Sequence, residues 1–67
     1  MVNKTARAKE DIITMFGIDR KPKTAIEIYE FISVHKLSRI RRALRLLELA
    51  STITSEMVGH SKAYKLA

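Results

Sequence analysis

Apolar residues recur at helical spacing along three stretches of this chain, and the stretch from residue 38 to residue 50 shows the pattern best. One side of that helix would hold its apolar residues, Ile40, Ala43, Leu44, Leu47 and Ala50. The opposite side and its flanks would hold Ser38, Arg39, Arg41, Arg42 and Arg45, with Glu48 as the one acid. The pattern predicts a helix with one buried wall and one exposed basic wall.

A first helix is expected over about residues 4–16, because residues 6, 8, 12, 13, 15 and 16 are apolar. Asn3 or Thr5 would cap its start, and Gly17 would end it in the left-handed conformation that suits glycine. Pro22 argues against helix in the connector that follows, which has room for a short edge strand.

A second helix, from about residue 24 to residue 34, is predicted by the clearest local signal in the chain. Thr24 is followed three residues later by Glu27, just before an apolar run, which is the pattern of a capping box. Residues 35–37 would then turn the chain into the basic helix, with Ser38 as its N-cap. Two helices joined by so short a turn form a helix-turn-helix.

After Ala50 the pattern changes from helical to alternating, and β-branched residues predict strands rather than helix. A hairpin is expected over about residues 52–66, with Gly59 and His60 at the turn. That turn sets a register that pairs Val58 with Ser61, Glu56 with Ala63, Ser55 with Tyr64, Thr54 with Lys65, and Ile53 with Leu66. Ile53, Tyr64 and Leu66 would then share the face turned to the core.

The expected fold is therefore mainly α with a small β-hairpin, an α+β arrangement. Three helices followed by a two-stranded wing is the order of a winged helix-turn-helix. The chain of 67 residues can support one core but not two, so residues 1–67 are expected to form a single domain.

The charge of the chain points to an anionic partner. Lys and Arg number 13 against 7 acids, which gives a net charge of +6 and a pI near 10.1, the range of nucleic-acid-binding domains. No apolar run approaches the roughly 20 residues of a membrane-spanning helix, and no secretory signal is visible. We therefore expect no membrane partner and a cytoplasmic location, at the nucleoid.

Enzyme chemistry is not expected. His35 and His60 are the only histidines, both fall in predicted turns, and cysteine is absent. Neither histidine has a carboxylate cluster or a Gly-rich phosphate loop beside it in the sequence. The sequence accordingly predicts no catalytic residue, no metal site and no cofactor.

From Thr24 to Ala67 the chain resembles the DNA-binding core of MarR/ArsR-type winged-helix transcriptional regulators. The resemblance depends on residues 24, 25, 27 and 28, on Arg42-Ala-Leu-Arg45 with Leu47 and Glu48, on Ile53 opening the strand, and on Tyr64 and Leu66 ending the hairpin. It implies that the helix from Ser38 enters the major groove and that the wing, residues 57–63, lies near the minor groove. The family's effector-binding helices and Cys clusters are absent from this chain, so no small-molecule ligand and no metal is expected.

The chain is thus expected to be a sequence-specific double-stranded DNA-binding protein that regulates transcription. The expected DNA-contacting residues are Lys36, Ser38, Arg39, Arg41, Arg42, Arg45, His60, Ser61 and Lys62. Among them Lys62 would meet a phosphate as a mobile point charge near the wing tip. Two alternatives stay open: a winged-helix protein-interaction module and a non-specific architectural DNA binder.

A homodimer is also expected. Ile12, Ile13, Met15 and Phe16 exceed what one narrow helical stripe needs, which suggests that part of the first helix is shared between two chains. Leu46 and Leu49 project away from the buried wall of the basic helix and offer a second candidate surface.

Overall fold

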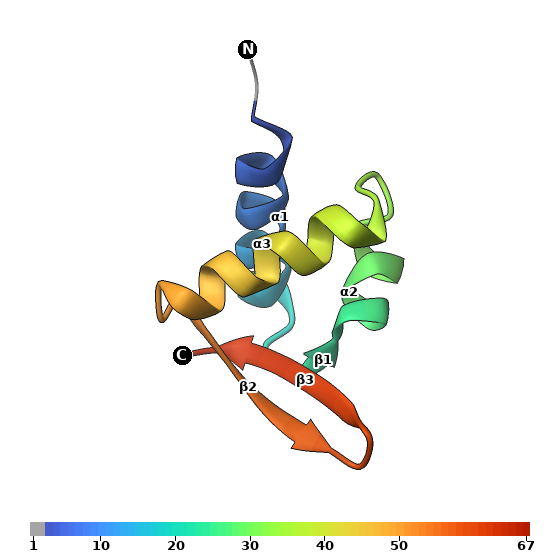
Figure 1. Ribbon diagram of the computed structural model, residues 1–67, viewed down its shortest axis with the longest axis vertical. Helices are drawn as coiled ribbons and strands as arrows, with labels where there is room; N and C mark the ends of the chain where they lie inside the picture. Colours follow the sequence, from blue (N-terminus) through green and yellow to red (C-terminus); the bar gives the residue numbers. More distant parts are fainter. Residues whose placement is uncertain (1–2) are drawn as a thin grey trace.

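The computed structural model describes residues 3–67 and contains three helices and three strands in the expected order. Their bounds are α1 Lys4–Ile18, β1 Lys23–Thr24, α2 Ala25–Phe31, α3 Leu37–Leu49, β2 Ile53–Val58 and β3 Ser61–Leu66. Figure 1 shows α3 lying across α1, with the strands below the helices.

The first helix is longer than its apolar pattern predicted. Asn3 caps its start, because its side-chain oxygen accepts from the backbone N–H of Thr5 at 3.0 Å and of Ala6 at 3.3 Å. Gly17 lies inside the helix rather than ending it, so the predicted end at residue 16 was wrong. Asp19 is the C-cap, and its N–H donates to the carbonyl of Met15 at 2.9 Å.

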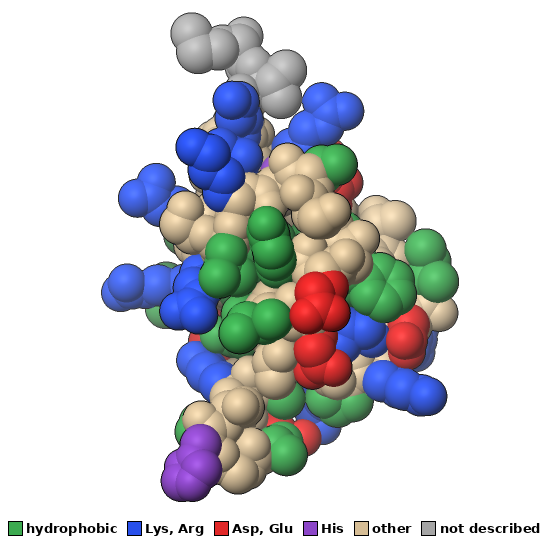
Figure 2. Space-filling model, turned by 90° about the vertical axis from the view of Figure 1, so that its right-hand side faces the viewer, with side chains coloured by type: hydrophobic (Ala, Val, Ile, Leu, Met, Phe, Trp, Pro, Cys, Tyr) green, Lys and Arg blue, Asp and Glu red, His purple; other side chains and the backbone are tan. Residues whose placement is uncertain are grey.

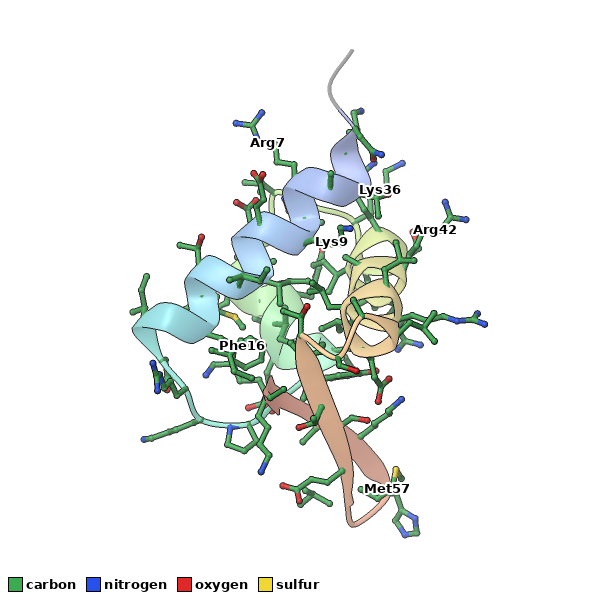
Figure 3. All side chains as sticks on the ribbon, turned by 90° about the vertical axis from the view of Figure 1, so that its left-hand side faces the viewer. Arg7, Lys9, Phe16, Lys36, Arg42 and Met57 are labelled. Atoms are coloured by element: carbon green, nitrogen blue, oxygen red, sulfur yellow. The ribbon has the colours of Figure 1, made fainter. Side chains whose placement is uncertain are left out.

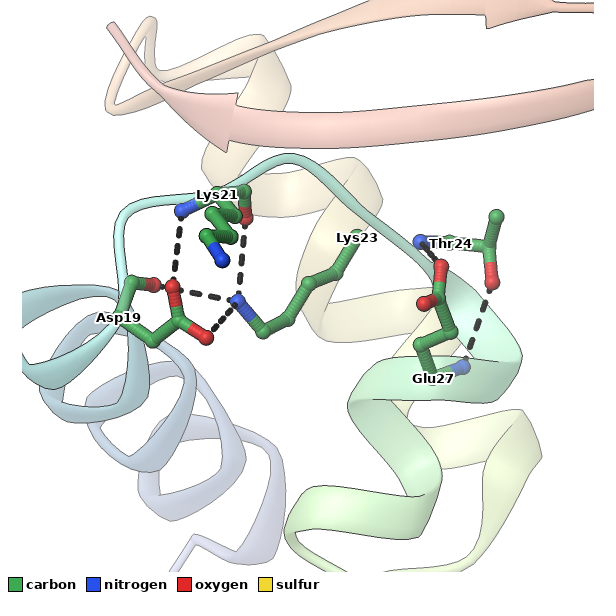
Figure 4. Close-up of polar contacts among 5 residues, drawn as sticks. All are labelled: Asp19, Lys21, Lys23, Thr24 and Glu27. Carbon is green, nitrogen blue, oxygen red and sulfur yellow. Dashed lines mark hydrogen bonds and ion pairs between the residues drawn. The ribbon is translucent and has the colours of Figure 1, made fainter.

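The connector after α1 is organised by a buried lysine, as Figure 4 shows. Lys23 Nζ donates to the carbonyl oxygens of Asp19 and Lys21 at 3.2 and 3.1 Å, and it lies 3.1 Å from the Asp19 carboxylate. The connector ends in β1, which pairs with β3 and makes the sheet three-stranded, in the order β1-β3-β2. The short edge strand for which the sequence left room is therefore present beside the two-stranded wing.

The capping box at Thr24 is confirmed. The Thr24 N–H donates to Glu27 Oε1 at 3.0 Å, and the Glu27 N–H donates to Thr24 Oγ1 at 3.3 Å (Figure 4). The helix that follows ends at Phe31, not at residue 34, so its predicted length was too great. Ile32 leaves helical geometry with φ −123° and ψ 55°, and residues 33–36 form the turn to α3.

The basic helix begins one residue before the predicted N-cap. Lys36 is the N-cap of α3 and gives no side-chain hydrogen bond to the first turn, whereas Ser38 lies within the helix, so the predicted cap was wrong. The predicted buried wall is confirmed for Ile40, Ala43, Leu44 and Leu47. Ala50, expected on that wall, is instead the exposed C-cap.

The hairpin register agrees with the prediction at every pair, from Ile53 with Leu66 to Val58 with Ser61. Gly59 has a φ of 64°, the left-handed conformation that a tight hairpin turn needs. Ile53 is fully buried, and Tyr64 and Leu66 pack against the core as half-buried residues. The base of the hairpin is therefore anchored while its tip extends into solvent.

The core is formed by all three helices and by Ile53 of β2. Its buried apolar residues are Ala8, Ile12, Met15, Phe16, Ile28, Ile40, Ala43, Leu44, Leu47 and Ile53. Three of the four α1 residues that the sequence assigned to a shared surface are thus inside a single chain. Of that group only Ile13 is exposed, at 41%.

Candidate nucleic-acid interface

The exposed wall of α3 carries the arginines that its spacing predicted. Arg41, Arg42 and Arg45 are exposed, and Arg39 is half-buried. In Figure 3 the labelled Arg42 projects from α3 into solvent. Because the opposite wall is fixed in the core, these guanidinium groups are held on a rigid element that faces outward.

The start of α3 adds a further part of the basic surface. Lys36, Ser38, Arg39 and Arg42 line a shallow groove of about 370 Å³ with Thr5 of α1. The first turn of α3 contains no acidic residue, and no side chain within residues 3–67 caps it. Its free N–H groups and its three cations both favour an anion such as phosphate.

The charge is distributed unevenly over the molecule. In Figure 2 several Lys and Arg side chains project along one edge, while the face turned to the viewer carries acidic side chains with some Lys or Arg beside them. That face belongs to α2, whose Glu27 and Glu30 are exposed. The arginine wall of α3 is therefore separate from the acidic side.

The wing tip is exposed, as the sequence predicted. Gly59, His60 and Ser61 are all exposed, and they join the ends of β2 and β3. Met57 and Val58 beside them are also largely exposed, at 66% and 60%. The tip thus makes no contribution to the core and is free to touch a partner.

Lys62 does not have the mobile environment that the sequence suggested. Its Nζ lies 3.0 Å from Glu48 Oε1 of α3 and 5.3 Å from the centre of the Tyr64 ring. Ser55 Oγ of β2 donates to the other carboxylate oxygen of Glu48. The expected mobile lysine is therefore tied to α3, because the hairpin register brings it opposite the last turns of that helix.

These contacts change the acidity of both groups. The hydrogen bonds from Ser55 and then from Lys62 hold the pKa of Glu48 below its usual value. The hydrogen bond to Glu48 raises the pKa of Lys62. Both residues are therefore charged at neutral pH.

A groove is lined by residues of β1, α2, α3 and β3. Its lining residues are Thr24, Ala25, Ile26, Arg41, Ser61, Lys62 and Tyr64, and its volume is about 410 Å³. Arg41 and Lys62 thus reach the same open space from different elements. The sequence named both residues but could not show that they share a groove.

Several residues near the site were not found from the sequence. Lys4 and Arg7 of α1 line a groove with Arg39, and Ser55 and Glu48 hold the wing. The sequence did contain a sign that Glu48 has a special role, because Glu48 is the one acid on the basic helix. The contribution of α1 had no local signal, since it depends on how α1 crosses α3.

The two histidines have different environments. His60 is exposed at the wing tip, as expected. His35 lies in the turn before α3, where the sequence placed it with no carboxylate cluster beside it. It is buried, and its Nε2 lies 2.6 Å from Asp11 Oδ2 of α1. This pair joins the turn before α3 to α1, and His35 lines a groove with Arg7 and Arg39.

None of the helices within residues 3–67 is long and apolar enough to cross a membrane. The same residues contain no group of three or more His, Cys, Asp or Glu side chains that could hold a metal ion.

Three helices, a helix-turn-helix and a two-stranded wing define a winged-helix domain. No protein-family model and no curated protein matches the sequence. Among solved structures, the chain is similar to one described as giving structural insights into the DNA recognition and protein interaction domains of HOP2 and its homologous DNA pairing properties. The TM-score is 0.82 at 17% sequence identity, over 90% of this chain and 98% of the other. The match confirms the winged-helix fold.

Proposed function

We propose that this chain binds double-stranded DNA and regulates transcription in a sequence-specific way. In this proposal α3 enters the major groove and the wing, residues 57–63, lies near the minor groove. The main observation that supports this proposal is the wall of exposed arginines on α3, whose opposite wall is buried in the core. The description of the HOP2 domains as DNA-recognising adds support. The place of action would be the nucleoid in the cytoplasm.

The DNA-contacting residues divide into two groups by position. Arg41, Arg42 and Arg45 project from the middle of α3, where a recognition helix meets base edges. Lys36, Ser38 and Arg39 lie at its start and would meet phosphates, as would His60, Ser61 and Lys62 of the wing. The first group would supply specificity and the second would supply affinity and orientation.

Selection from a pool of random duplexes tests this proposal directly. The expected result is an enriched motif of a few base pairs that Arg42→Ala no longer enriches, with binding that weakens as salt rises. Retention of every duplex without enrichment would instead indicate a non-specific architectural DNA binder. Failure to retain any duplex at low salt would rule out the proposal that the chain binds DNA.

One observation favours a second candidate function, protein interaction. Ile26 and Phe31 of α2 are 53% and 57% exposed. Phe31 also lines a groove with Asp19, Glu27 and Glu30 and with Lys21 and Lys23, so this face combines an apolar side chain with charges of both signs. In this alternative the α2 face would contact a protein partner, and Phe31→Ala would weaken that contact while DNA binding stayed unchanged.

A further inference from the structure

Glu48 of α3 contacts both strands of the wing through its side chain. One carboxylate oxygen lies 3.0 Å from Lys62 Nζ on β3, and the other accepts from Ser55 Oγ on β2. The Glu48 and Lys62 side chains are 33% and 47% exposed, so the pair lies at the surface rather than in the core. Glu48 therefore adds a polar link between the recognition helix and a wing whose base is anchored in the core by Ile53.

The same contact pairs Glu48 with Lys62, a cation that lines the groove described above. Lys62 and Arg41 both line that groove, and Lys62 lies over the Tyr64 ring. A phosphate that entered the groove would find two cations, one of which, Lys62, is already paired with the carboxylate of Glu48. The carboxylate would repel it and would compete with it for the Lys62 ammonium.

We propose that Glu48 is a positioning residue. In the free protein it holds Lys62 and Ser55 of the wing against α3, and on DNA binding it releases Lys62 to a phosphate. This inference depends on the proposed DNA-binding function. Binding would then break or share an exposed ion pair. Such a pair is weak, which limits the cost to about a twofold to fivefold loss of affinity.

Glu48→Gln is the first test. Glutamine keeps the size of the side chain and can still accept from Lys62, but it carries no charge. The affinity for a duplex that the wild-type chain binds is expected to rise about twofold to fivefold. The matched control is Glu56→Gln, which removes the same charge from an exposed position on β2, where Glu56 pairs with Ala63. Its effect is expected to be smaller.

A double-mutant cycle separates the Lys62 contact from general repulsion. Lys62→Met should lower the slope of log affinity against log salt by about 0.9, the value for one phosphate. In the Lys62→Met background, Glu48→Gln should raise affinity no more than Glu56→Gln does, because only general repulsion is then removed and no ammonium remains to be released. A gain from Glu48→Gln that stays as large as in the wild-type background would overturn the inference.

A measurement on the wild-type chain guards against a variant that fails to fold. The Glu48 side-chain carboxyl signal can be followed by carbon NMR through a pH titration, with and without duplex. Loss of Lys62 to a phosphate should raise the pKa of Glu48 in the complex. An unchanged Glu48 pKa in the complex, or equal gains from the two Gln variants, would overturn the inference and leave DNA binding intact. A wild-type chain that binds no duplex would overturn both.

Discussion

Lys23 shows how a single residue can join elements that the sequence keeps apart. It is 6% exposed, and its ammonium lies 5.7 Å and 5.6 Å from the centres of the Phe16 and Phe31 rings. Two backbone carbonyls and the Asp19 carboxylate complete its surroundings. A buried cation is tolerated only with such partners. Through these contacts Lys23 of β1 links α1 with α2.

Ser51 is the second unusual residue, since it has a φ of 61° without being glycine. Its N–H donates to the carbonyl of Glu48 at 3.0 Å, and the N–H of Thr52 donates to the carbonyl of Leu47 at 2.9 Å. These bonds form a Schellman motif at the end of α3, in which the left-handed position favours glycine. Ser51→Gly is therefore expected to stabilise the domain.

The gain from Ser51→Gly should be about 0.5 kcal/mol, because relief of the left-handed conformation exceeds the entropy that glycine adds to the unfolded chain. Thermal unfolding would show a rise of a few degrees in Tm. Ser33→Gly, in the turn between α2 and α3 where no positive φ occurs, serves as the control and should not stabilise. A lower Tm for Ser51→Gly would contradict the expected strain.

At the scale of elements, α3 joins the core to the proposed DNA surface, and its two walls can be tested separately. Arg42→Ala and Arg45→Ala should each weaken DNA binding by about 1–3 kcal/mol if the residue meets a base edge. Neither change should alter Tm, because both side chains are exposed. Leu44→Ala should instead destabilise the fold by about 2–5 kcal/mol, because Leu44 is 0% exposed. The reverse pattern would mean that the recognition face lies elsewhere.

The contact between α3 and the wing should make stability depend on pH. The pKa of Glu48 is lowered in the folded chain, so its contribution is fully present above the usual glutamate pKa and is lost as pH falls through the lowered value. The stability difference between the wild-type chain and Glu48→Gln is therefore expected to be largest near neutral pH and to shrink below about pH 4. Urea unfolding from pH 7 to pH 3 measures it. A difference that grows in acid would contradict the lowered pKa.

The elements that could be predicted from the sequence are those fixed by neighbouring residues. The capping box at Thr24 and the hairpin register depend on spacing within a few positions, and both were confirmed. The predicted ends of α1 and α2 and the predicted cap of α3 were wrong, because a sequence pattern defines the ends of a helix less sharply than the helix itself. The pairs His35 with Asp11 and Lys62 with Glu48 span 24 and 14 residues, so no local pattern could reveal them.

For the whole molecule, the net charge of +6 bears on affinity rather than on fold. If the proposed surface meets about five phosphates, log affinity should fall against log salt with a slope near −4 to −5, at roughly 0.9 per phosphate. Fluorescence anisotropy of a labelled duplex over about a tenfold range of salt measures the slope. Arg20→Ala, on the connector after α1, is a control that lowers the net charge outside the proposed surface and should leave the slope unchanged. An affinity for DNA that does not change with salt concentration would contradict a phosphate-binding surface.

Assembly is the second property of the whole molecule, and a homodimer remains our proposal. The core uses Ile12, Met15 and Phe16 within one chain, which leaves Leu46 and Leu49 of α3 as the better candidate contact, at 41% and 73% exposed. Light scattering at tens of micromolar is expected to give a mass near twice 7.7 kDa. Leu49→Ser should return the mass to that of one chain, whereas Ile13→Ser on α1 should not. A two-fold dimer would read a two-fold symmetric site, so loss of the dimer should also weaken binding to a palindrome more than to its half-site. A wild-type monomer across this range would remove the dimer and assign the exposed leucines to another partner.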